Sequence, residues 1–182
     1  VSTNADAVVF VRMMDMMNGT SSPPPLEFNN VGADFYGADL DWRFQMGDRW
    51  SLNGVINYVR GERQDIEDAL YRVAPLNGFV ALDYVSDRWA LSIESFLQDA
   101  QNRVSATNAE ETSDGYVLFN LKGYWRIARE LRLGFGVDNL TDKVFRDHLA
   151  GVNRVSGNEA VSVGERLPGY GRSFFLRMDY EW

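Results

Sequence analysis

Apolar and polar side chains alternate along segment after segment of this chain, and this alternation limits its fold more than any other feature. In the clearest segment the apolar positions are Tyr36, Ala38, Leu40, Trp42, Phe44 and Met46, and the positions between them are glycine, polar or charged. Similar segments lie near 50–59, 79–84, 89–98, 117–126, 131–138 and 174–182. A period of two is that of a β-strand, whose successive side chains point to opposite faces. With a looser opening strand near 7–14, we expect about eight strands of roughly 8–12 residues, the length that crosses a bilayer when tilted.

The connections between these segments alternate in length. Turns near residues 47, 87 and 129 are only two or three residues long. Long connections cover about 17–30, 61–78, 100–114 and 141–170. Short periplasmic turns at one end and long extracellular loops at the other are typical of outer-membrane barrels. The sequence therefore predicts an all-β, antiparallel transmembrane β-barrel.

Composition agrees with a barrel and excludes several other functions. Of the 182 residues 45% are hydrophobic, yet the mean hydropathy is −0.30, because alternating strands hide their hydrophobicity from averages. The chain has no cysteine, which rules out disulfides, thiolate metal ligands and cysteine nucleophiles. A net charge of −8 argues against nucleic acid as a partner. No nucleophile–base set is recognisable, so we expect neither an enzyme nor a cofactor.

The tryptophans and the charged residues favour opposite faces of the predicted wall. All five tryptophans occupy apolar positions, and we expect them to form one belt at the periplasmic water–lipid boundary: Trp42, Trp50, Trp89, Trp125 and Trp182. The other face carries Asp39, Asp41, Arg43, Asp83, Glu94, Lys122, Arg126, Arg132, Arg177, Asp179 and Glu181. Facing lipid, each charge would cost roughly 2–4 kcal/mol near the midplane, so we expect this face to line the lumen.

The last third of the chain resembles the C-terminal end of TonB-dependent outer-membrane receptors. Residues 133–143, LGFGVDNLTDK, look like the family's penultimate strand running into its N-L-x-D-K signature, and residues 144–149, VFRDHL, match the aromatic and H-L positions that follow. Residues 167–175, LPGYGRSFF, look like the P-G-x-G-R-x-F start of the final strand. Upstream, residues 35–40 occupy the place of the family's G-x-E strand, with Asp39 where Glu is usual. The motifs are specific when taken together, in this order.

The resemblance implies a larger barrel than this chain can form. The family builds roughly 22 strands around a plug, so residues 1–182 would be a partial barrel domain of about eight C-terminal strands, with the plug and the earlier strands absent. It also implies a receptor in the bacterial outer membrane, surrounded by outer-membrane lipid. Such a receptor takes up a metal or metal chelate, siderophore-like or copper. The TonB energy-transducing complex would act on it through the absent N-terminal segment.

The final strand is similar to the signal by which the barrel assembly machinery recognises its clients. Its alternate residues are Phe174, Leu176, Met178, Tyr180 and Trp182. An exposed terminal strand can add to the edge of another sheet, and the same side chains would later face lipid. We expect this strand to close the barrel against a first strand that the chain does not include.

A methionine cluster at the extracellular end of the first predicted strand suggests a substrate. Four of the six methionines stand together: Met13, Met14, Met16 and Met17. Thioethers select Cu(I), and Asp15 and the only histidine, His148, could complete a site, as in copper-associated TonB-dependent receptors. The competing interpretation is that the methionines fill an apolar gap. Loop carboxylates that could contact a ligand, or simply be solvated, are Asp142, Asp147 and Glu165.

Two other interpretations remain open. A complete small barrel of about eight strands, with a structural or adhesive role, would have to pair its lumen charges across a narrow interior. A soluble β-sandwich binder is the weaker alternative. If the chain is a barrel fragment, its first and last strands are unpaired edges, which lipid does not tolerate, so we expect the isolated piece to fold poorly.

Overall fold

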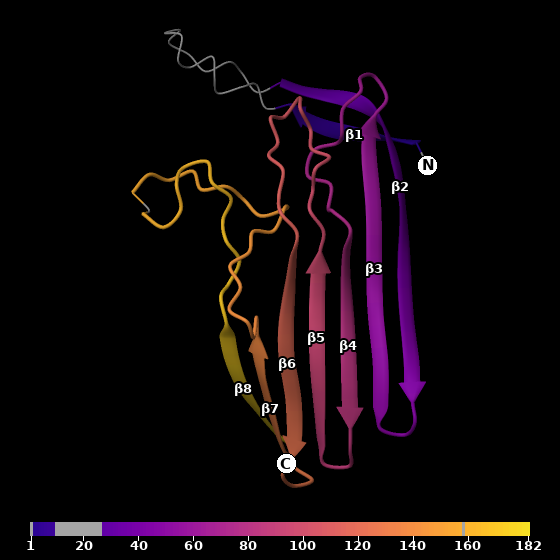
Figure 1. Ribbon diagram of the computed structural model, residues 1–182, viewed down its shortest axis with the longest axis vertical. Helices are drawn as coiled ribbons and strands as arrows, with labels where there is room; N and C mark the ends of the chain where they lie inside the picture. Colours follow the sequence, from indigo (N-terminus) through magenta and orange to yellow (C-terminus); the bar gives the residue numbers. More distant parts are fainter. Residues whose placement is uncertain (1, 10–26, 158) are drawn as a thin grey trace.

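Eight strands pair in the order in which they follow one another along the chain (Figure 1). The computed structural model describes residues 2–9, 27–157 and 159–182. The strands are β1 (Ser2–Val9), β2 (Glu27–Met46), β3 (Trp50–Arg63), β4 (Asn77–Val85), β5 (Trp89–Gln98), β6 (Tyr116–Arg126), β7 (Leu131–Asp138) and β8 (Ser173–Tyr180). Every neighbouring pair is antiparallel, as the sequence predicted.

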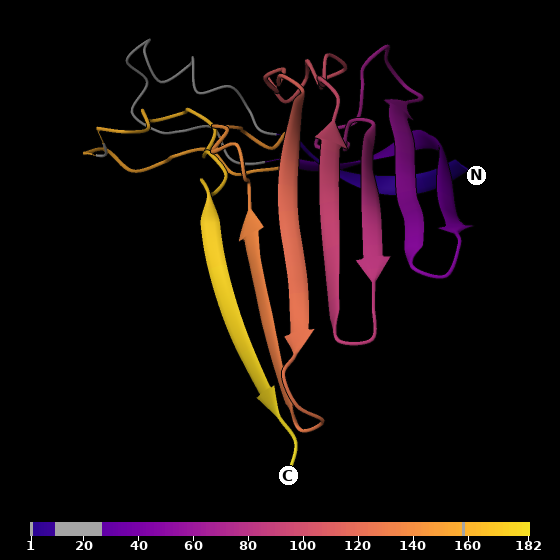
Figure 2. The same ribbon diagram turned by 60° about the horizontal axis from the view of Figure 1, so that its bottom comes forward.

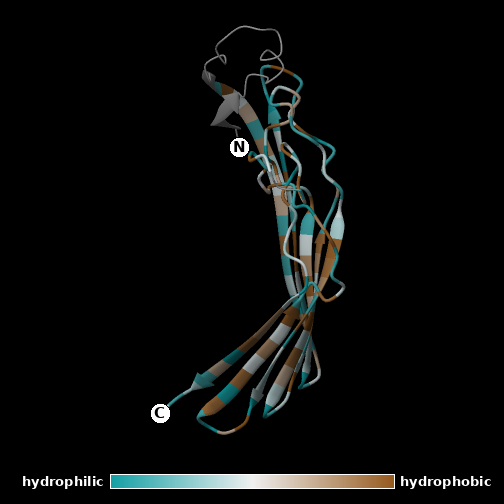
Figure 3. Ribbon diagram, turned by 90° about the vertical axis from the view of Figure 1, so that its left-hand side faces the viewer, coloured by the Kyte–Doolittle hydropathy of each residue, from teal (hydrophilic) through white to brown (hydrophobic). Residues whose placement is uncertain are grey.

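The register of these pairs aligns the alternating apolar positions of β2–β8 on one face of the sheet, whereas the other face is mainly polar but also carries the row Val55, Phe79, Phe96 and Leu118. One row across β2–β6 runs through Leu40, Ile56, Gly78, Leu97 and Val117. Seen from the side in Figure 3, the sheet is a curved single layer in which hydrophobic and hydrophilic residues alternate along the strands. A one-residue slip would move each apolar set to the other face, so the alternation itself sets the register.

The polar face is braced by hydrogen bonds and ion pairs between neighbouring strands. Asp83 on β4 accepts hydrogen bonds from Asn53 Nδ2 on β3 and from Ser92 Oγ on β5, each at 2.6 Å. Further along the sheet, Lys122 Nζ lies 2.7 Å from Glu94 Oε2. These polar groups therefore satisfy one another along the wall.

The two ends of the sheet differ in their connections, as Figures 1 and 2 show. Residues 47–49, 86–88 and 127–130 make short turns at one end, called here the turn end. Residues 64–76, 99–115 and 139–172 make long loops at the other, the long-loop end. The predicted sorting of loops by side is confirmed for these connections. Residues 10–26, between β1 and β2, lie outside the described residues.

Two of the described strands are longer than expected, because β3 has 14 residues and β2 has 20. β2 has 20 residues because its first part pairs with β1, from Glu27 to Asp34, and its second part pairs with β3, from Ala33 to Met46. Alternation weakens in the first part, where the strand reaches the loops and no longer needs an apolar face. The opening strand is described over Ser2–Val9, and residues 10–14 of the predicted segment 7–14 lie outside the described residues.

The sheet is open rather than closed. β1 and β8 lie at opposite edges, and each pairs with one neighbour within the described residues. A complete small barrel would require β8 to pair with β1, so the sheet corresponds to part of a barrel wall. No helix in the described ranges is long and apolar enough to span a membrane.

Candidate functional site

Three long loops meet around His148, whose side chain is fully buried. Its Nδ1 lies 3.0 Å from Ser113 Oγ and 3.1 Å from Arg166 Nη1, and its Nε2 lies 3.2 Å from Glu110 Oε1. A guanidinium only donates hydrogen bonds, so Nδ1 is the acceptor and the ring proton is on Nε2, facing the carboxylate. Burial lowers the pKa of His148, the Glu110 carboxylate opposes this shift, and the Arg166 guanidinium adds to it. The imidazole is therefore neutral in this arrangement.

Glu110 joins two of these loops through their backbones. Only 4% of its side chain is exposed. Oε1 accepts a hydrogen bond from the Arg72 amide and Oε2 accepts one from the Ser105 amide, both at 2.9 Å. Arg72 also donates from its guanidinium to the Leu149 carbonyl, in the third loop. A buried carboxylate needs such donors, and here they come from segments about 30 to 40 residues apart in sequence.

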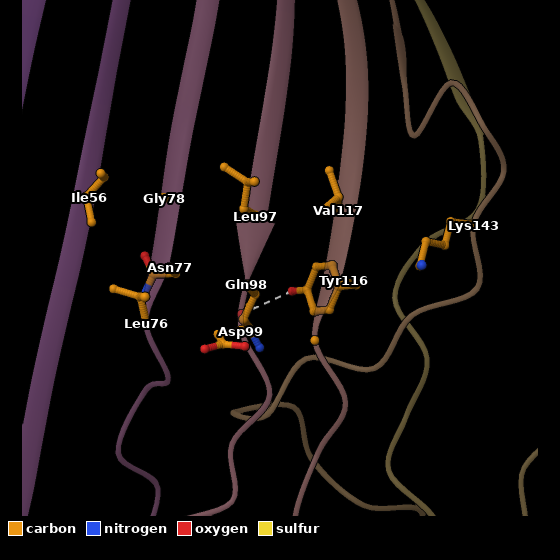
Figure 4. Close-up of a pocket in the computed structure, with 11 residues that line it drawn as sticks. Ile56, Leu76, Asn77, Gly78, Leu97, Gln98, Asp99, Tyr116, Val117 and Lys143 are labelled. Atoms are coloured by element: carbon orange, nitrogen blue, oxygen red, sulfur yellow. Dashed lines mark hydrogen bonds between the residues drawn. The ribbon is translucent and has the colours of Figure 1, made fainter.

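A second set of polar contacts ties the β7–β8 loop to the ends of β5 and β6. The Tyr116 hydroxyl donates to Asp147 Oδ2 at 3.0 Å and lies 3.2 Å from the Gln98 side-chain amide. Figure 4 marks the contact between Tyr116 and Gln98. When the Gln98 amide nitrogen faces Asp147 Oδ2, at 3.0 Å, its oxygen faces the His148 amide, at 3.3 Å. The Leu149 amide donates to Asp147 Oδ1 at 2.7 Å. Asp147 is thus a packed loop residue rather than a solvated charge.

Asp68, in the β3–β4 loop, binds the tip of the β5–β6 loop. It accepts hydrogen bonds from the amides of Ala106, at 2.8 Å, and Thr107, at 3.0 Å, and from Ser105 Oγ, at 3.2 Å. Burial raises the pKa of Asp68, but these hydrogen bonds outweigh burial and hold it below its ordinary value. We call His148, Glu110, Ser113, Arg166, Asp147 and Asp68, with the backbone groups that they bind, the loop cluster.

The N-L-x-D-K segment joins the beginning and the end of the β7–β8 loop. Asn139 has a left-handed backbone, with φ of 51°, and its side chain is bonded to both backbone groups of Lys143 and to the Tyr170 carbonyl. Asp142 Oδ1 accepts a hydrogen bond from the Arg172 amide at 2.8 Å. The motif and the start of the final strand are therefore parts of one structural unit, and Asp142 serves that unit.

The predicted copper ligands fall into two groups. Met13, Met14, Met16 and Met17 lie outside the described residues. His148 is described, and both of its ring nitrogens face partners within the loop cluster. Across the described ranges, no three His, Cys, Asp or Glu side chains converge as a metal site would require. The remaining loop carboxylate of the prediction, Glu165, pairs with Arg146.

The tryptophans do not all lie at the same distance along the strands. Tyr84 lies between Trp50 and Trp89, with both ring centroids 4.8 Å from its own, and Trp89 pairs with Trp125 across β5 and β6. Trp182 follows β8. Trp42 pairs with Gly54 on β3. It is four residues before Met46, which pairs with Trp50, so Trp42 lies about 13 Å further along the strand from the turn end than Trp50 does. The alternate residues of the final strand are all exposed: Phe174, Leu176, Met178, Tyr180 and Trp182.

The sequence did not identify three of the other charged members of the loop cluster. Glu110, Arg166 and Asp68 are ordinary charged residues in long loops, and no local spacing sets them apart. Their contacts join residues 18 to 39 positions apart, so only the pairing of the strands beneath brings them together. The one local signal was that the single histidine lies in a long loop.

Comparison with known proteins adds independent information. Residues 6–140 match the family described as TonB dependent receptor-like, beta-barrel. The solved copper transporter OprC is 27% identical with a TM-score of 0.76, over 84% of this chain and 24% of that one. No curated protein sequence matches the chain.

Two further solved structures share the fold at lower identity. The ferric citrate transporter FecA is 16% identical with a TM-score of 0.64, over 83% of this chain and 24% of that one. The ferric yersiniabactin uptake receptor FyuA from Yersinia pestis is 16% identical with a TM-score of 0.67, over 86% and 25%. The chain thus spans about a quarter of the length of these proteins.

Proposed function

The chain belongs to the TonB-dependent receptor β-barrel family, and from this premise we propose that it is part of an outer-membrane receptor that takes up copper. The turn end would face the periplasm and the long-loop end the exterior. The polar face, with its braced carboxylates and cations, would line the lumen. Energy would come from the TonB complex, which in this family acts through the plug region rather than through the barrel wall.

The observation that carries the choice of copper is the similarity to OprC. That structure is 27% identical to the chain, whereas the ferric citrate transporter FecA and the ferric yersiniabactin uptake receptor FyuA are 16% identical. The methionine cluster is consistent with the same substrate, because thioethers are soft ligands that prefer Cu(I) over harder ions. Val9 pairs with Glu27 at the long-loop end, so the connection that carries the cluster starts at the expected exterior face.

We assign the metal contact first to Met13, Met14, Met16 and Met17. His148 would be a fifth ligand only after Arg166 or Glu110 has given up its contact with the imidazole. Breaking buried polar contacts costs about 1–3 kcal/mol per group left without a partner, so the methionines alone should supply most of the affinity.

The test is Cu(I) binding by the full-length receptor that contains this segment. Under anaerobic conditions, competition with a chromophoric Cu(I) chelator gives the Kd of the receptor and of a variant with all four cluster methionines changed to leucine. The matched control changes the other two methionines, Met46 and Met178, to leucine. We expect the cluster variant to bind at least about tenfold more weakly, because four soft ligands are lost, and the control to be unchanged.

One further variant completes the test. A His148→Gln variant that binds as tightly as the parent would assign copper to the methionines alone, whereas weaker binding would add the imidazole to the site. If the cluster variant keeps the parent's Kd, the copper proposal fails. Uptake of a ferric chelate in place of copper would then be the function to examine in this family.

A further inference from the structure

The apolar face of the sheet carries a groove near the long-loop end (Figure 4). Its floor is one register row across β3–β6, formed by Ile56, Gly78, Leu97 and Val117. Gly78 has no side chain, so the row is hollowed between Ile56 and Leu97, and Leu76 lines the groove beside the loops. The groove has a volume of about 540 Å³, within the range of small-molecule sites.

A second, more polar hollow of about 290 Å³ adjoins this groove. It is lined by the next residues of β3, including Tyr58 and Arg60, and by Arg103 from the β5–β6 loop. Leu76 and Asp99 line both hollows. Along β3 the apolar hollow at Ile56 therefore comes first and the cationic hollow follows it toward the loops.

Lys143, Arg60 and Arg103 line the two hollows, and two of these three cations form no ion pair with a described residue. Within the described part of the chain, neither Lys143, at the end of the apolar row, nor Arg103 forms a salt bridge. Figure 4 shows Lys143 beyond Val117, in line with the row. Arg60 is held beside Glu62, with its guanidinium 5.6 Å from the Tyr36 ring centroid.

Two carboxylates also lie at these hollows. Glu62 is neutralised by Arg60. Asp99 accepts a hydrogen bond from the Ala100 amide at 2.8 Å and has no cationic partner in the described residues. Lys143 and Arg103, the two cations without an ion pair, therefore stand against one uncompensated carboxylate, and the two hollows together favour an anionic group.

The height of the groove fits the margin of the membrane. Leu97 is eight residues along β5 from Trp89, which corresponds to about 27 Å along the strand. At a tilt of about 40° this is roughly 20 Å across the bilayer, close to the height of a barrel's apolar band. The groove thus lies at the opposite margin of the apolar face from Trp50, Trp89 and Trp125.

We propose that the two hollows bind one phosphorylated glycolipid of the outer leaflet. An acyl chain lies in the groove over Gly78, and the phosphorylated head group contacts Lys143, Arg60 and Arg103. Each hollow fits one part of such a molecule. The groove is apolar and would face the acyl chains, and the adjoining cations would face the phosphorylated head groups. A soluble phosphate would leave the groove empty, and an uncharged lipid would leave the cations without a partner.

The test measures retention of lipid by the purified full-length receptor in detergent, with bis-phosphorylated hexa-acyl lipid A as the probe in native mass spectrometry. A Lys143→Met and Arg103→Gln double variant should bind the probe at least about tenfold more weakly, because two cations near the head group are lost. An Asp99→Asn variant should bind more tightly than the parent. The matched control, Arg88→Gln with Arg129→Gln, removes the same charge at the turn end and should leave binding unchanged.

Two comparison lipids and one competitor, inorganic phosphate, make the outcome decisive. Phosphatidylglycerol and a dephosphorylated lipid A should both bind more weakly than lipid A itself, whereas inorganic phosphate should not compete. The proposal is overturned if the double variant and its control bind lipid A equally, or if dephosphorylated lipid A binds as tightly. Heat-modifiable migration on a gel verifies that each variant is folded, and no copper is present, so the result is independent of the proposed substrate.

Discussion

His148 Nε2 and Glu110 Oε1 lie 3.2 Å apart, and both side chains are buried where three long loops meet. Glu110 is in the β5–β6 loop and His148 in the β7–β8 loop, and the backbone of the β3–β4 loop donates to the same carboxylate. The pair therefore holds the three long loops in one arrangement above the sheet. In a receptor whose loops contact the substrate, this arrangement positions the loop surface, and several consequences can be measured.

Changing Glu110 to alanine should loosen two loops at once. The amides of Arg72 and Ser105 lose their acceptor, and each buried donor left unpaired costs about 1–3 kcal/mol. We expect hydrogen–deuterium exchange of both amides in the full-length receptor to become about 5- to 150-fold faster. Glu111→Ala, which removes an exposed neighbouring carboxylate, is the control. Equal exchange in the two variants would contradict the role of Glu110.

The loop cluster should weaken at acidic pH. Burial lowers the pKa of His148, with Glu110 opposing and Arg166 adding to the shift, so the closed cluster takes up a proton at lower pH than the open one. Its stability is then complete above about pH 6.5, the ordinary histidine value, and falls as the pH drops from there toward the lowered pKa. Exchange of the loop amides, corrected for intrinsic rates, should rise between pH 7.5 and pH 5. This pH dependence should be absent in His148→Gln, and its persistence there would assign the effect to another group.

Gly54 should not tolerate a side chain, because the Trp42 indole lies against it. A Cβ at Gly54 would be 2.5 Å from Trp42 Cζ2 and 2.7 Å from the Phe79 carbonyl oxygen. We expect Gly54→Ala to lower the stability of the barrel by about 1–3 kcal/mol, measured as the temperature of heat-modifiable unfolding in detergent. Gly151→Ala is the matched control, since nothing lies within 4 Å of its Cβ. A Gly54→Ala barrel that melts with this control would show that the indole can move aside.

Asn139 should be essential for the start of the last loop. Replacing it by alanine removes its side-chain hydrogen bonds to Lys143 and Tyr170. Alanine also has a Cβ atom at a left-handed φ of 51°, and no side-chain hydrogen bond offsets that strain. We expect Asn139→Ala to lower the free energy of unfolding by about 2–4 kcal/mol. Asn139→Gly should recover up to about 1 kcal/mol of this loss, because glycine readily adopts this backbone conformation. Thermal unfolding of both variants, with Thr141→Ala as control, measures the two parts separately. If alanine and glycine are equally destabilising, backbone strain has no share in the effect.

The tryptophans should report two depths in the membrane. Trp50, Trp89 and Trp125 are joined through ring contacts and strand pairing at the turn end, whereas Trp42 is four residues further along β2. In receptors that each keep one of these tryptophans, quenching by lipids brominated at different depths should place the first three together at the interface. Trp42 should be quenched deeper in the bilayer. One shared depth for all four would contradict the register of β2 and β3.

Much of the wall could be predicted from the sequence because its signals are local. A side-chain period of two assigns each residue to a face, whatever its neighbours in space, and turn lengths sort the two ends. The strand order followed from the shortness of the turns at 47–49, 86–88 and 127–130. The extra length of β2 was missed because its first part pairs with β1 in the loop region, where the apolar–polar alternation weakens.

The sequence by itself thus determined which residues share each face of the sheet, which connections are short or long, and which family the motifs resemble. Tertiary structure alone decided that His148 meets Glu110 and Arg166, that Asp142 serves the Arg172 amide, and that Gly78 hollows a row between Ile56 and Leu97. The physical reason is the same in each case. These contacts join residues far apart in sequence, and their distances depend on the register of several strands, each set by its own alternation and turn.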